Sequence, residues 1–471
     1  MINRFFTQKI KENFPFLPTD DQHFALEKIT DFLFSQEKDE VFLLKGYAGT
    51  GKSSLIGSLV KTMTEFKQKT VLLAPTGRAA KVFSSYAAQS ALTIHKKIYR
   101  QKKIDGEGAF ALAENLHKHT LFIIDEASMI SNDVGEFSIF GSGRLLDDLI
   151  EYVYTGEGCR MLLIGDTAQL PPVKQENSPA LDDSVLRSYF LQVKEATLTE
   201  IVRQAEESGI LSNATMLRNA LINSCTSDFP KLQTDMLSDI KRVSGAELID
   251  EISDAYRRNG VEETIVISRS NKRVNVYNNG IRNTVLDREE ELSRGDLLMI
   301  TKNNYFWAEK NENIDFFANG EFVEVVRIRG EEEMYGFRFC NALLYHSDYD
   351  IEFEAKILLD VLHTEVSGLT HEQNHRFFAT VMEDYQDISQ KRERYKAMKQ
   401  NPYFNALQTK YGYAVTCHKA QGGEWKNVFL DVGYVDKSYM GAGFYRWLYT
   451  AVTRCSARLY LVNLPKEFGV E

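Results

Sequence analysis

The chain has 471 residues, of which 43% are hydrophobic and 26% charged, which is ordinary for a soluble globular protein of roughly three domains. No apolar run approaches the roughly 20 residues of a membrane span, and the apolar stretch of the N-terminal segment is too short for a signal peptide. We therefore expect a cytoplasmic protein, or a nuclear one in a nucleated cell. The net charge of −10 gives no general attraction for nucleic acid, although it can hide basic patches, and the five scattered cysteines indicate neither a zinc site nor a disulfide framework.

Short apolar runs that end in polar or glycine-rich residues mark the first half of the chain. They are VFLLKG (41–46), TVLLAPT (70–76), TLFIIDEAS (120–128) and RMLLIGD (160–166). Such runs predict strands buried on both faces of a parallel sheet, joined by crossover helices. Ligands bind these sheets at the carboxyl ends of the strands, where the polar residues of the runs lie.

The second half predicts another α/β domain with an insert of different texture. Its apolar runs are ETIVISRSN (263–271), GYAVTCHKAQGG (412–423), WKNVFLDVG (425–433) and ARLYLVN (457–463). Alternating runs over 294–360 predict a small antiparallel barrel, with Trp307, Phe316 and Phe317 in its core, and 371–399 predicts a solvated helix beside it. We expect a first domain over 1–200, a second over 201–293 and 404–471, and the barrel with its helical extension over 294–403.

The segment GYAGTGKSS fits the pattern G-x-x-x-x-G-K-[ST] between a predicted strand and a predicted helix. Glycines let backbone N–H groups approach phosphates, and the helix N-terminus adds positive potential. We expect Lys52 to reach the β- and γ-phosphates of ATP and Ser53 to hold Mg²⁺. The expected nucleotide contacts are Gly46, Ala48, Gly49, Thr50, Gly51, Lys52, Ser53 and Ser54. A glycine-rich turn without a ligand is the alternative.

Two further strand ends carry residues suited to phosphate chemistry. Asp125 and Glu126 follow LFII, where Asp125 would complete the Mg²⁺ shell and Glu126 would act as general base toward water. Gln169, in GDTAQLPP, would sense the γ-phosphate. The alternatives are an acidic helix cap for the first pair and a simple polar turn for the second.

Eight motifs follow one another from about Gln22 to Arg458. They are GYAGTGKSS, APTGRAAKV, TIHKKIY, IIDEAS, IGDTAQLPPV, LTEIVRQ, VTCHKAQGGEW and YTAVTRC. In this order they resemble superfamily 1 helicases, most closely the 5′-to-3′ branch of RecD-like and phage Dda-like enzymes. The resemblance implies an α/β fold of two RecA-like P-loop NTPase domains in tandem, with an SH3-like β-barrel insert in the second and a short hairpin insert in the first. It also implies ATP and Mg²⁺ as cofactors.

The resemblance assigns roles around the nucleotide. Arg203 and Arg454 look like the arginines that the second domain directs at the γ-phosphate, where they would neutralise charge in the transition state. A surface ion pair is the alternative for either arginine.

Three other residues resemble nucleotide contacts of this family. Gln22 looks like the adenine-reading glutamine, and Gly422 and Glu424 look like the motif that contacts ribose and phosphate. An exposed glutamine without a ligand is the alternative for Gln22. Many relatives have serine where this chain has Gly423, so a side-chain contact there is in doubt.

Several residues after strand ends resemble the strand-binding motifs of the family, because hydroxyls and backbone N–H groups there can hold phosphates. They are Pro75, Thr76, Arg78, Thr93, His95, Ser268, Asn271, Thr416 and His418. For each histidine the alternative is a structural role.

The hairpin expected at about 98–112 lies where relatives split the duplex. Phe110 would stack there on the first base pair, and a plain surface loop is the alternative. The opening of the barrel, RGDLLMITKNN, also resembles the 5′-to-3′ branch.

We therefore expect an ATP-dependent 5′-to-3′ DNA helicase, acting as a monomer on single-stranded DNA and on junctions of single and double strands, beside replication, recombination or repair proteins. The alternatives are a translocase that remodels forks or strips proteins with little unwinding, an RNA-directed helicase, a nucleic-acid-binding scaffold without ATPase chemistry, and a P-loop kinase of small molecules. The presence of Lys52, Asp125, Glu126 and Arg454 argues against the scaffold, and the second α/β domain argues against the kinase.

Overall fold

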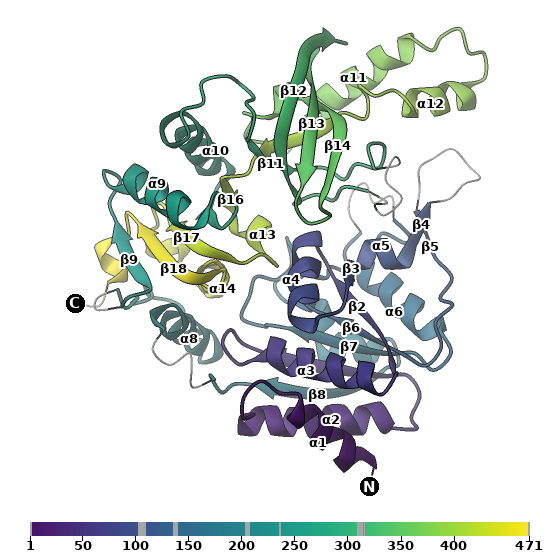
Figure 1. The fold of residues 1–471 in the computed structure, drawn as a ribbon, viewed down its shortest axis with the longest axis vertical. Helices are drawn as coiled ribbons and strands as arrows, with labels where there is room; N and C mark the ends of the chain where they lie inside the picture. Colours follow the sequence, from purple (N-terminus) through teal and green to yellow (C-terminus); the bar gives the residue numbers. More distant parts are fainter. Residues whose placement is uncertain are drawn as a thin grey trace.

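Two parallel sheets and a closed barrel form the body of the molecule (Figure 1). The computed structural model describes residues 2–101, 110–134, 140–202, 208–234, 237–308, 314, 316–366 and 368–469. The predicted fold class, two RecA-like domains with a barrel insert, is confirmed. No helix within these ranges has the length and hydrophobicity needed to cross a bilayer.

The first sheet has the strand order β3-β2-β6-β7-β1-β8, all parallel. Its strands are β1 (Glu40–Gly46), β2 (Lys69–Ala74), β3 (Ala91–Thr93), β6 (Thr120–Ile124), β7 (Arg160–Gly165) and β8 (Gln192–Leu198). Both faces are buried, because Val41 and Leu43 enter one core and Phe42 and Leu44 enter the other.

Helices cover both faces of this sheet. One face carries α1 (Ile2–Glu12), α2 (Asp20–Phe34), α3 (Lys52–Glu65) and α4 (Gly77–Ala87). The other carries α5 (Ile94–Ile98), α6 (Leu145–Thr155) and α7 (Asp183–Ser188). The antiparallel pair β4 (Tyr99–Gln101) and β5 (Phe110–Leu112) forms the base of the predicted hairpin, whose tip at 102–109 lies outside the described residues.

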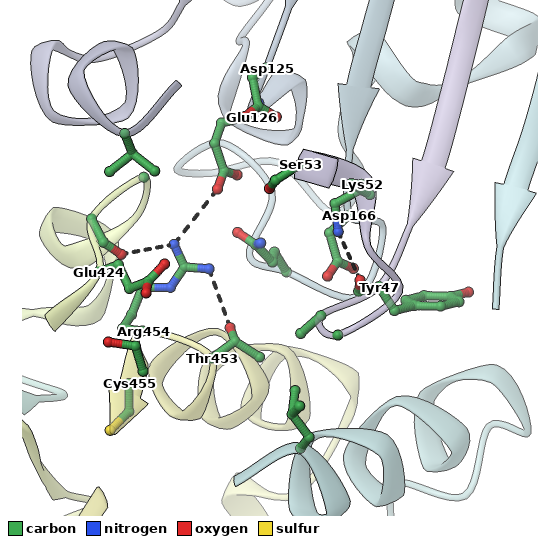
Figure 2. A pocket seen from close by; sticks show the side chains of 18 of the residues that line it. Tyr47, Lys52, Ser53, Asp125, Glu126, Asp166, Glu424, Thr453, Arg454 and Cys455 are labelled. Carbon is green, nitrogen blue, oxygen red and sulfur yellow. Dashed lines mark hydrogen bonds and ion pairs between the residues drawn. The ribbon is translucent and has the colours of Figure 1, made fainter. Parts of the chain in front are cut away.

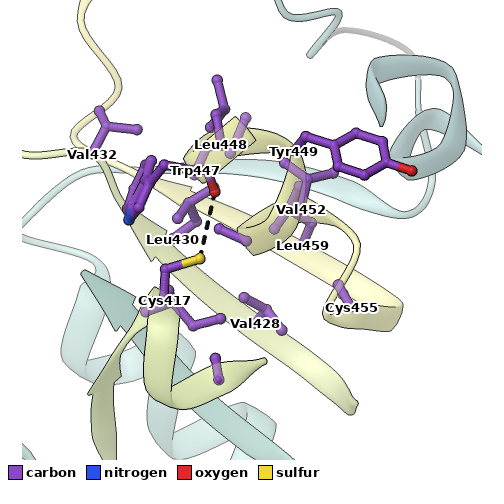
Figure 3. Close-up of a cluster of buried hydrophobic side chains, with 14 of the residues drawn as sticks. Cys417, Val428, Leu430, Val432, Trp447, Leu448, Tyr449, Val452, Cys455 and Leu459 are labelled. Carbon is purple, nitrogen blue, oxygen red and sulfur yellow. Dashed lines mark hydrogen bonds between the residues drawn. The ribbon is translucent and has the colours of Figure 1, made fainter. Parts of the chain in front are cut away.

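The second sheet has the order β16-β10-β17-β18-β9, again parallel. Its strands are β9 (Ile240–Val243), β10 (Thr264–Ser268), β16 (Ala414–Thr416), β17 (Trp425–Asp431) and β18 (Cys455–Val462). One face packs against α8 (Gly209–Ile222), α13 (Cys417–Ala420) and α14 (Ala442–Val452), and the other against α9 (Leu248–Asn259) and α10 (Asn271–Gly280). Figure 3 shows Trp447, Leu448 and Val452 of α14 over the strands of this sheet.

The barrel is closed by β11 (Leu297–Ile300), β12 (Phe322–Met334), β13 (Phe337–His346), β14 (Ile351–Leu358) and β15 (Leu407–Tyr411). Because β15 pairs with both β14 and β11, the insert continues past the predicted boundary at residue 403. The predicted helix over 371–399 is two helices, α11 (His371–Glu383) and α12 (Lys391–Lys399), which pack against the barrel through Phe377, Val381 and Met398. Trp307, Phe316 and Phe317 are buried, as predicted.

A buried charge network fixes the barrel to the second sheet. The carboxylate of Asp296, just before β11, accepts hydrogen bonds from Arg282, Arg288 and Tyr413, and Tyr413 follows β15. Asp296 is completely buried, so its charge needs these partners. The network therefore clamps both points where the chain passes between the sheet and the barrel.

Candidate active site

The phosphate-binding loop lies between β1 and α3 in the geometry that its sequence predicts. Gly49 and Gly51 have φ of +76° and +75°, a left-handed conformation that favours glycine. The Lys52 ammonium donates to the carbonyl oxygens of Gly46 and Tyr47 at 2.8 and 2.9 Å, so it lies inside the loop (Figure 2). The loop can therefore present N–H groups and one cation to a phosphate chain.

Asp125 and Glu126 follow β6 beside this loop. One Asp125 oxygen accepts the Glu126 N–H at 2.8 Å, and the other accepts the hydroxyl of Tyr86. Burial, together with the charge of Glu126, raises the pKa of Asp125 to about 6. Glu126 has φ of +50°, and its side chain points toward Arg454 of the second domain (Figure 2).

Arg454 reaches this space from the second domain. Its guanidinium lies 3.7 Å from the carboxylate of Glu126 and donates to the carbonyl oxygens of Thr450 and Gly423 (Figure 2). Arg454 is only 6% exposed, so this ion pair is not a solvated surface contact. The arginine and the proposed general base thus face each other across the domain boundary.

These groups line one cavity of about 410 Å³. Its walls include Lys52, Ser53, Asp125, Glu126, Gln169, Gly422, Glu424 and Arg454, from both domains. The buried Oε1 atom of Gln169 has no hydrogen-bond partner among the described residues. A phosphate chain fits the loop, and a hydroxyl with one carboxylate fits Mg²⁺, which needs few protein ligands when phosphates supply others. Ser53 and Asp125 would hold the ion.

Gln22 contacts the phosphate-binding loop but does not line the cavity. Its amide donates to the carbonyl of Thr50 at 2.9 Å and accepts the N–H of Thr19 at 3.0 Å. A Cβ at Gly51 would lie 2.4 Å from the Gln22 amide nitrogen, so loop and glutamine are in close contact. In this arrangement Gln22 positions the loop, and its reading of adenine stays a prediction.

Gly422 and Gly423 line the cavity on the side of the second domain and lie against residues of the first domain. A Cβ on Gly423 would lie 2.6 Å from the Trp425 ring and 2.9 Å from Nε of Arg78. The Arg78 guanidinium stacks on that ring at 3.9 Å and donates to the carbonyl of Glu424. Glycine therefore stands at position 423 because Trp425 and Arg78 occupy the space of a side chain.

Some predicted strand-binding residues meet in a second cavity, of about 170 Å³. Thr76 and Arg78 from the first domain and His418 from the second line it together with the barrel segment 319–321. Burial lowers the pKa of the neighbouring Lys419 to about 8, and this lysine hydrogen-bonds Asn319 of the barrel. Both sheets and the barrel thus contribute polar groups to one place.

Other predicted contacts have structural surroundings. His95 packs between Tyr99 and Phe140, and burial lowers its pKa to about 4, as expected of a structural histidine. Thr93 caps α5. Within the predicted stretch 268–271, Ser268 is completely buried, and Ser270 caps α10 in front of the exposed Asn271.

Two more predicted positions lie at the ends of short strands. Thr416 precedes α13 and makes no capping hydrogen bond with its side chain. Pro75 is half-buried after β2.

Phe110 lies at the base of the hairpin and not at an exposed edge. It is 9% exposed, and its ring packs against Phe140 at 5.0 Å and against Tyr305 of the barrel insert at 4.7 Å. Stacking on a base pair would require this packing to open. Arg203 falls within 203–207, outside the described residues, so its role stays a prediction.

Asp166, Tyr449 and Tyr86 are among the residues of the site that were not predicted. Asp166 lies in the cavity wall and is 1% exposed, which raises its pKa, and Tyr449 donates to it. Tyr86 donates to Asp125. The position of Asp166 directly after the predicted strand RMLLIG was a signal for its role. The two tyrosines are far along the chain from the aspartates that they contact, so no local sequence pattern indicates them.

Two family models match the chain on both sides of the first cavity. One, described as an AAA domain, matches residues 19–225, and the other, a UvrD-like helicase C-terminal domain, matches residues 411–462. The first match contains Lys52 and Asp125, and the second contains Arg454.

Curated relatives are distant in sequence. An uncharacterized protein of Acanthamoeba polyphaga mimivirus is 23% identical, over 93% of this chain and 98% of that protein. The ATP-dependent RecD2 DNA helicase of Deinococcus radiodurans is 23% identical over 89% of this chain and 46% of its own length. The ATP-dependent DNA helicase Dda of phage T4 is 23% identical over 62% of this chain and 64% of its own length. The chain thus spans less than two thirds of either helicase.

Solved structures resemble the chain over nearly its whole length. A Pif1 helicase from Bacteroides in complex with ADP-AlF3 and single-stranded DNA is 15% identical, with a TM-score of 0.49 over 97% of this chain and 95% of that one. A structure of two coordinating Pif1 helicases, on DNA unwinding at forked double-stranded DNA, is 16% identical. Its TM-score is 0.48 over 97% of this chain and 94% of that one.

Proposed function

We propose that the chain is a superfamily 1B helicase, which couples ATP hydrolysis to 5′-to-3′ movement along single-stranded DNA and to the opening of duplexes. The matches to an AAA domain and to a UvrD-like helicase C-terminal domain support this proposal. The observation that carries the proposal is the meeting of Arg454 with Glu126 over the phosphate-binding loop. A nucleotide bound there would contact both domains at once, so its hydrolysis would change how they close. Because one chain lines the whole cavity, the proposed unit is a monomer.

Each residue has a distinct part in this proposal. Lys52 and the loop N–H groups bind the β- and γ-phosphates, and Glu126 accepts a proton from the attacking water. Arg454 leaves Glu126 to neutralise charge that develops on the γ-phosphate. Mg²⁺, held by Ser53 and Asp125, would supply further neutralisation of the phosphate oxygens.

The second cavity supports a nucleic-acid strand as the partner of this motor. The N-terminus of α4, capped by Thr76, and the side chains of Arg78 and His418 converge there from two domains that the nucleotide would move. Hydroxyls, backbone N–H groups and cations of this kind hold phosphates without reading sequence. The names of the RecD2 and Dda relatives favour DNA over RNA. The 5′-to-3′ direction rests on the TIHK motif and on the barrel.

ATP turnover with and without single-stranded DNA tests the proposal. We expect oligo(dT) to stimulate hydrolysis several-fold. Lys52→Ala should abolish turnover with and without DNA, because the phosphates lose a cationic partner that contributes several kcal/mol in the transition state. ATP turnover that DNA leaves unchanged would instead favour a small-molecule kinase. Near-normal turnover in Lys52→Ala would contradict the assignment of the ATP site.

A further inference from the structure

The hydroxyl of Tyr86 contacts the carboxylate that the proposed function assigns to the metal. Tyr86 is the penultimate residue of α4 and lines the nucleotide cavity. It donates to Oδ2 of Asp125, while Oδ1 accepts the Glu126 N–H at 2.8 Å. Both oxygens of Asp125 are therefore oriented by donors, one of them a side chain from a different element.

The position of Tyr86 is fixed from two sides. Its ring stacks on the fully buried ring of Phe83, with centroids 5.1 Å apart and planes at 27°. Helix α3 approaches so closely that a Cβ on Gly57 would lie 2.7 Å from the Tyr86 carbonyl oxygen. Since α3 begins at Lys52, the C-terminal end of α4 is held against the helix of the phosphate-binding loop.

The other end of α4 faces the proposed strand. Thr76 caps the helix, and Gly77 and Arg78 line the second cavity, where Glu321 of the barrel approaches Gly77. At about 1.5 Å per residue, the helix spans roughly 16 Å between the two cavities. Its two ends thus contact the strand site and the metal ligand.

We propose that Tyr86 is a positioning residue that orients Asp125 toward the metal and, through α4, links strand binding to that carboxylate. This inference rests on the proposed function. It adds Tyr86 to the metal site and helix α4 as the connection between strand binding and that site. Groups that orient a metal ligand typically change metal affinity by about 10- to 100-fold when removed. The hydroxyl of Tyr86 should therefore affect metal binding itself, before any turnover.

Binding of Mn²⁺, followed by electron paramagnetic resonance in the presence of a non-hydrolysable ATP analogue, measures this without catalysis. We expect Tyr86→Phe to bind Mn²⁺ about 10-fold more weakly than the wild type. Tyr154→Phe is the matched control, because its hydroxyl, in the same domain, donates to the carbonyl of Glu40 at 2.7 Å, away from the cavity. The control should bind Mn²⁺ like the wild type.

A second arm adds oligo(dT) to the same samples. In the wild type we expect the strand to tighten Mn²⁺ binding, and in Tyr86→Phe we expect this effect to disappear. If Tyr86→Phe does not fold, Gly57→Ala tests the same link, since its methyl group would push on the Tyr86 carbonyl and shift the end of α4, again weakening Mn²⁺ binding.

The outcomes separate two failures. Unchanged Mn²⁺ affinity in Tyr86→Phe, with a wild type that binds Mn²⁺ and hydrolyses ATP faster on DNA, would overturn the role of Tyr86 and leave the proposed function standing. If Tyr154→Phe weakens Mn²⁺ binding equally, the change in affinity reflects protein stability, and the role of Tyr86 is overturned as well. A wild type without metal-nucleotide binding would overturn both.

Discussion

Tyr449 of the second domain donates a hydrogen bond of 2.5 Å to Oδ2 of Asp166 in the first domain. The same hydroxyl accepts the N–H of Ala48, in the phosphate-binding loop, at 2.9 Å. Figure 3 shows this hydroxyl pointing away from the core cluster to which its ring belongs. The contact therefore joins the end of α14 that precedes Arg454 to the first domain and to its phosphate-binding loop.

Tyr449→Phe keeps the ring in the core and removes both hydrogen bonds. Asp166 is 1% exposed, so loss of its donor should cost about 1–3 kcal/mol of folding free energy. We expect a lower thermal midpoint and weaker DNA-stimulated ATP turnover, with unchanged DNA affinity in the absence of nucleotide. Tyr445→Phe, on the same helix, loses a hydrogen bond to the Asp228 carbonyl and serves as control. Equal effects of Tyr449→Phe and Tyr445→Phe on ATP turnover would contradict a role of the Tyr449 hydroxyl in joining the two domains.

Glu126→Gln should bind ATP and hydrolyse it at least about 100-fold more slowly, because the amide keeps the shape of the side chain and cannot accept a proton. Equilibrium binding of a fluorescent ATP analogue and single-turnover hydrolysis separate the two steps. A collapse of nucleotide affinity would show that Glu126 is structural, through its ion pair with Arg454.

Arg454→Ala should slow hydrolysis strongly and leave DNA binding without nucleotide nearly intact, because its proposed catalytic contact forms only with nucleotide in the closed cleft. The half-buried Arg458 provides a control, since its guanidinium donates to the carbonyl of Ser238. Turnover and DNA anisotropy should be measured on both alanine variants, with thermal midpoints. Parallel loss of both activities in Arg454→Ala would point to misfolding or to a DNA contact.

Gly423→Ser introduces the residue that many members of the resembled family carry. Its Cβ would collide with the Trp425 ring, which is 2% exposed and cannot move freely, and would displace Arg78. We expect a loss of about 1–3 kcal/mol in stability and weaker binding of single-stranded DNA. Gly443→Ser, where no described residue outside the local helix backbone lies within 4 Å of the added Cβ, should leave both unchanged. Wild-type behaviour of Gly423→Ser would show that the glycine is not required by packing.

The sequence predicts the central strands well because they are continuous apolar runs buried on both faces. It misses β8 and β9, which lie at sheet edges, and β8 alternates between exposed and buried residues. Closure of the barrel by β15 is also missed, since that strand follows two helices and pairs with segments distant in the chain.

The residues of the candidate site also fall into those that the sequence predicts and those that it misses. The phosphate-binding loop and Asp125 are predictable because their chemistry depends on local spacing after a strand. Tyr86 and Asp125 are 39 residues apart, and Tyr449 and Asp166 are 283 apart, so only the folded chain reveals these pairs. Phe110 has the expected place in a hairpin, but its burial against Tyr305 depends on how the barrel packs on the first domain.

Strand displacement from tailed duplexes tests the central proposal most directly. Two substrates share one duplex, and one carries a 5′ single-stranded tail while the other carries a 3′ tail. With ATP and Mg²⁺, we expect the wild type to separate the 5′-tailed duplex and to leave the 3′-tailed duplex intact, with Lys52→Ala inactive on both. Efficient separation of the 3′-tailed duplex, or of neither duplex while DNA still stimulates hydrolysis, would contradict a 5′-to-3′ helicase.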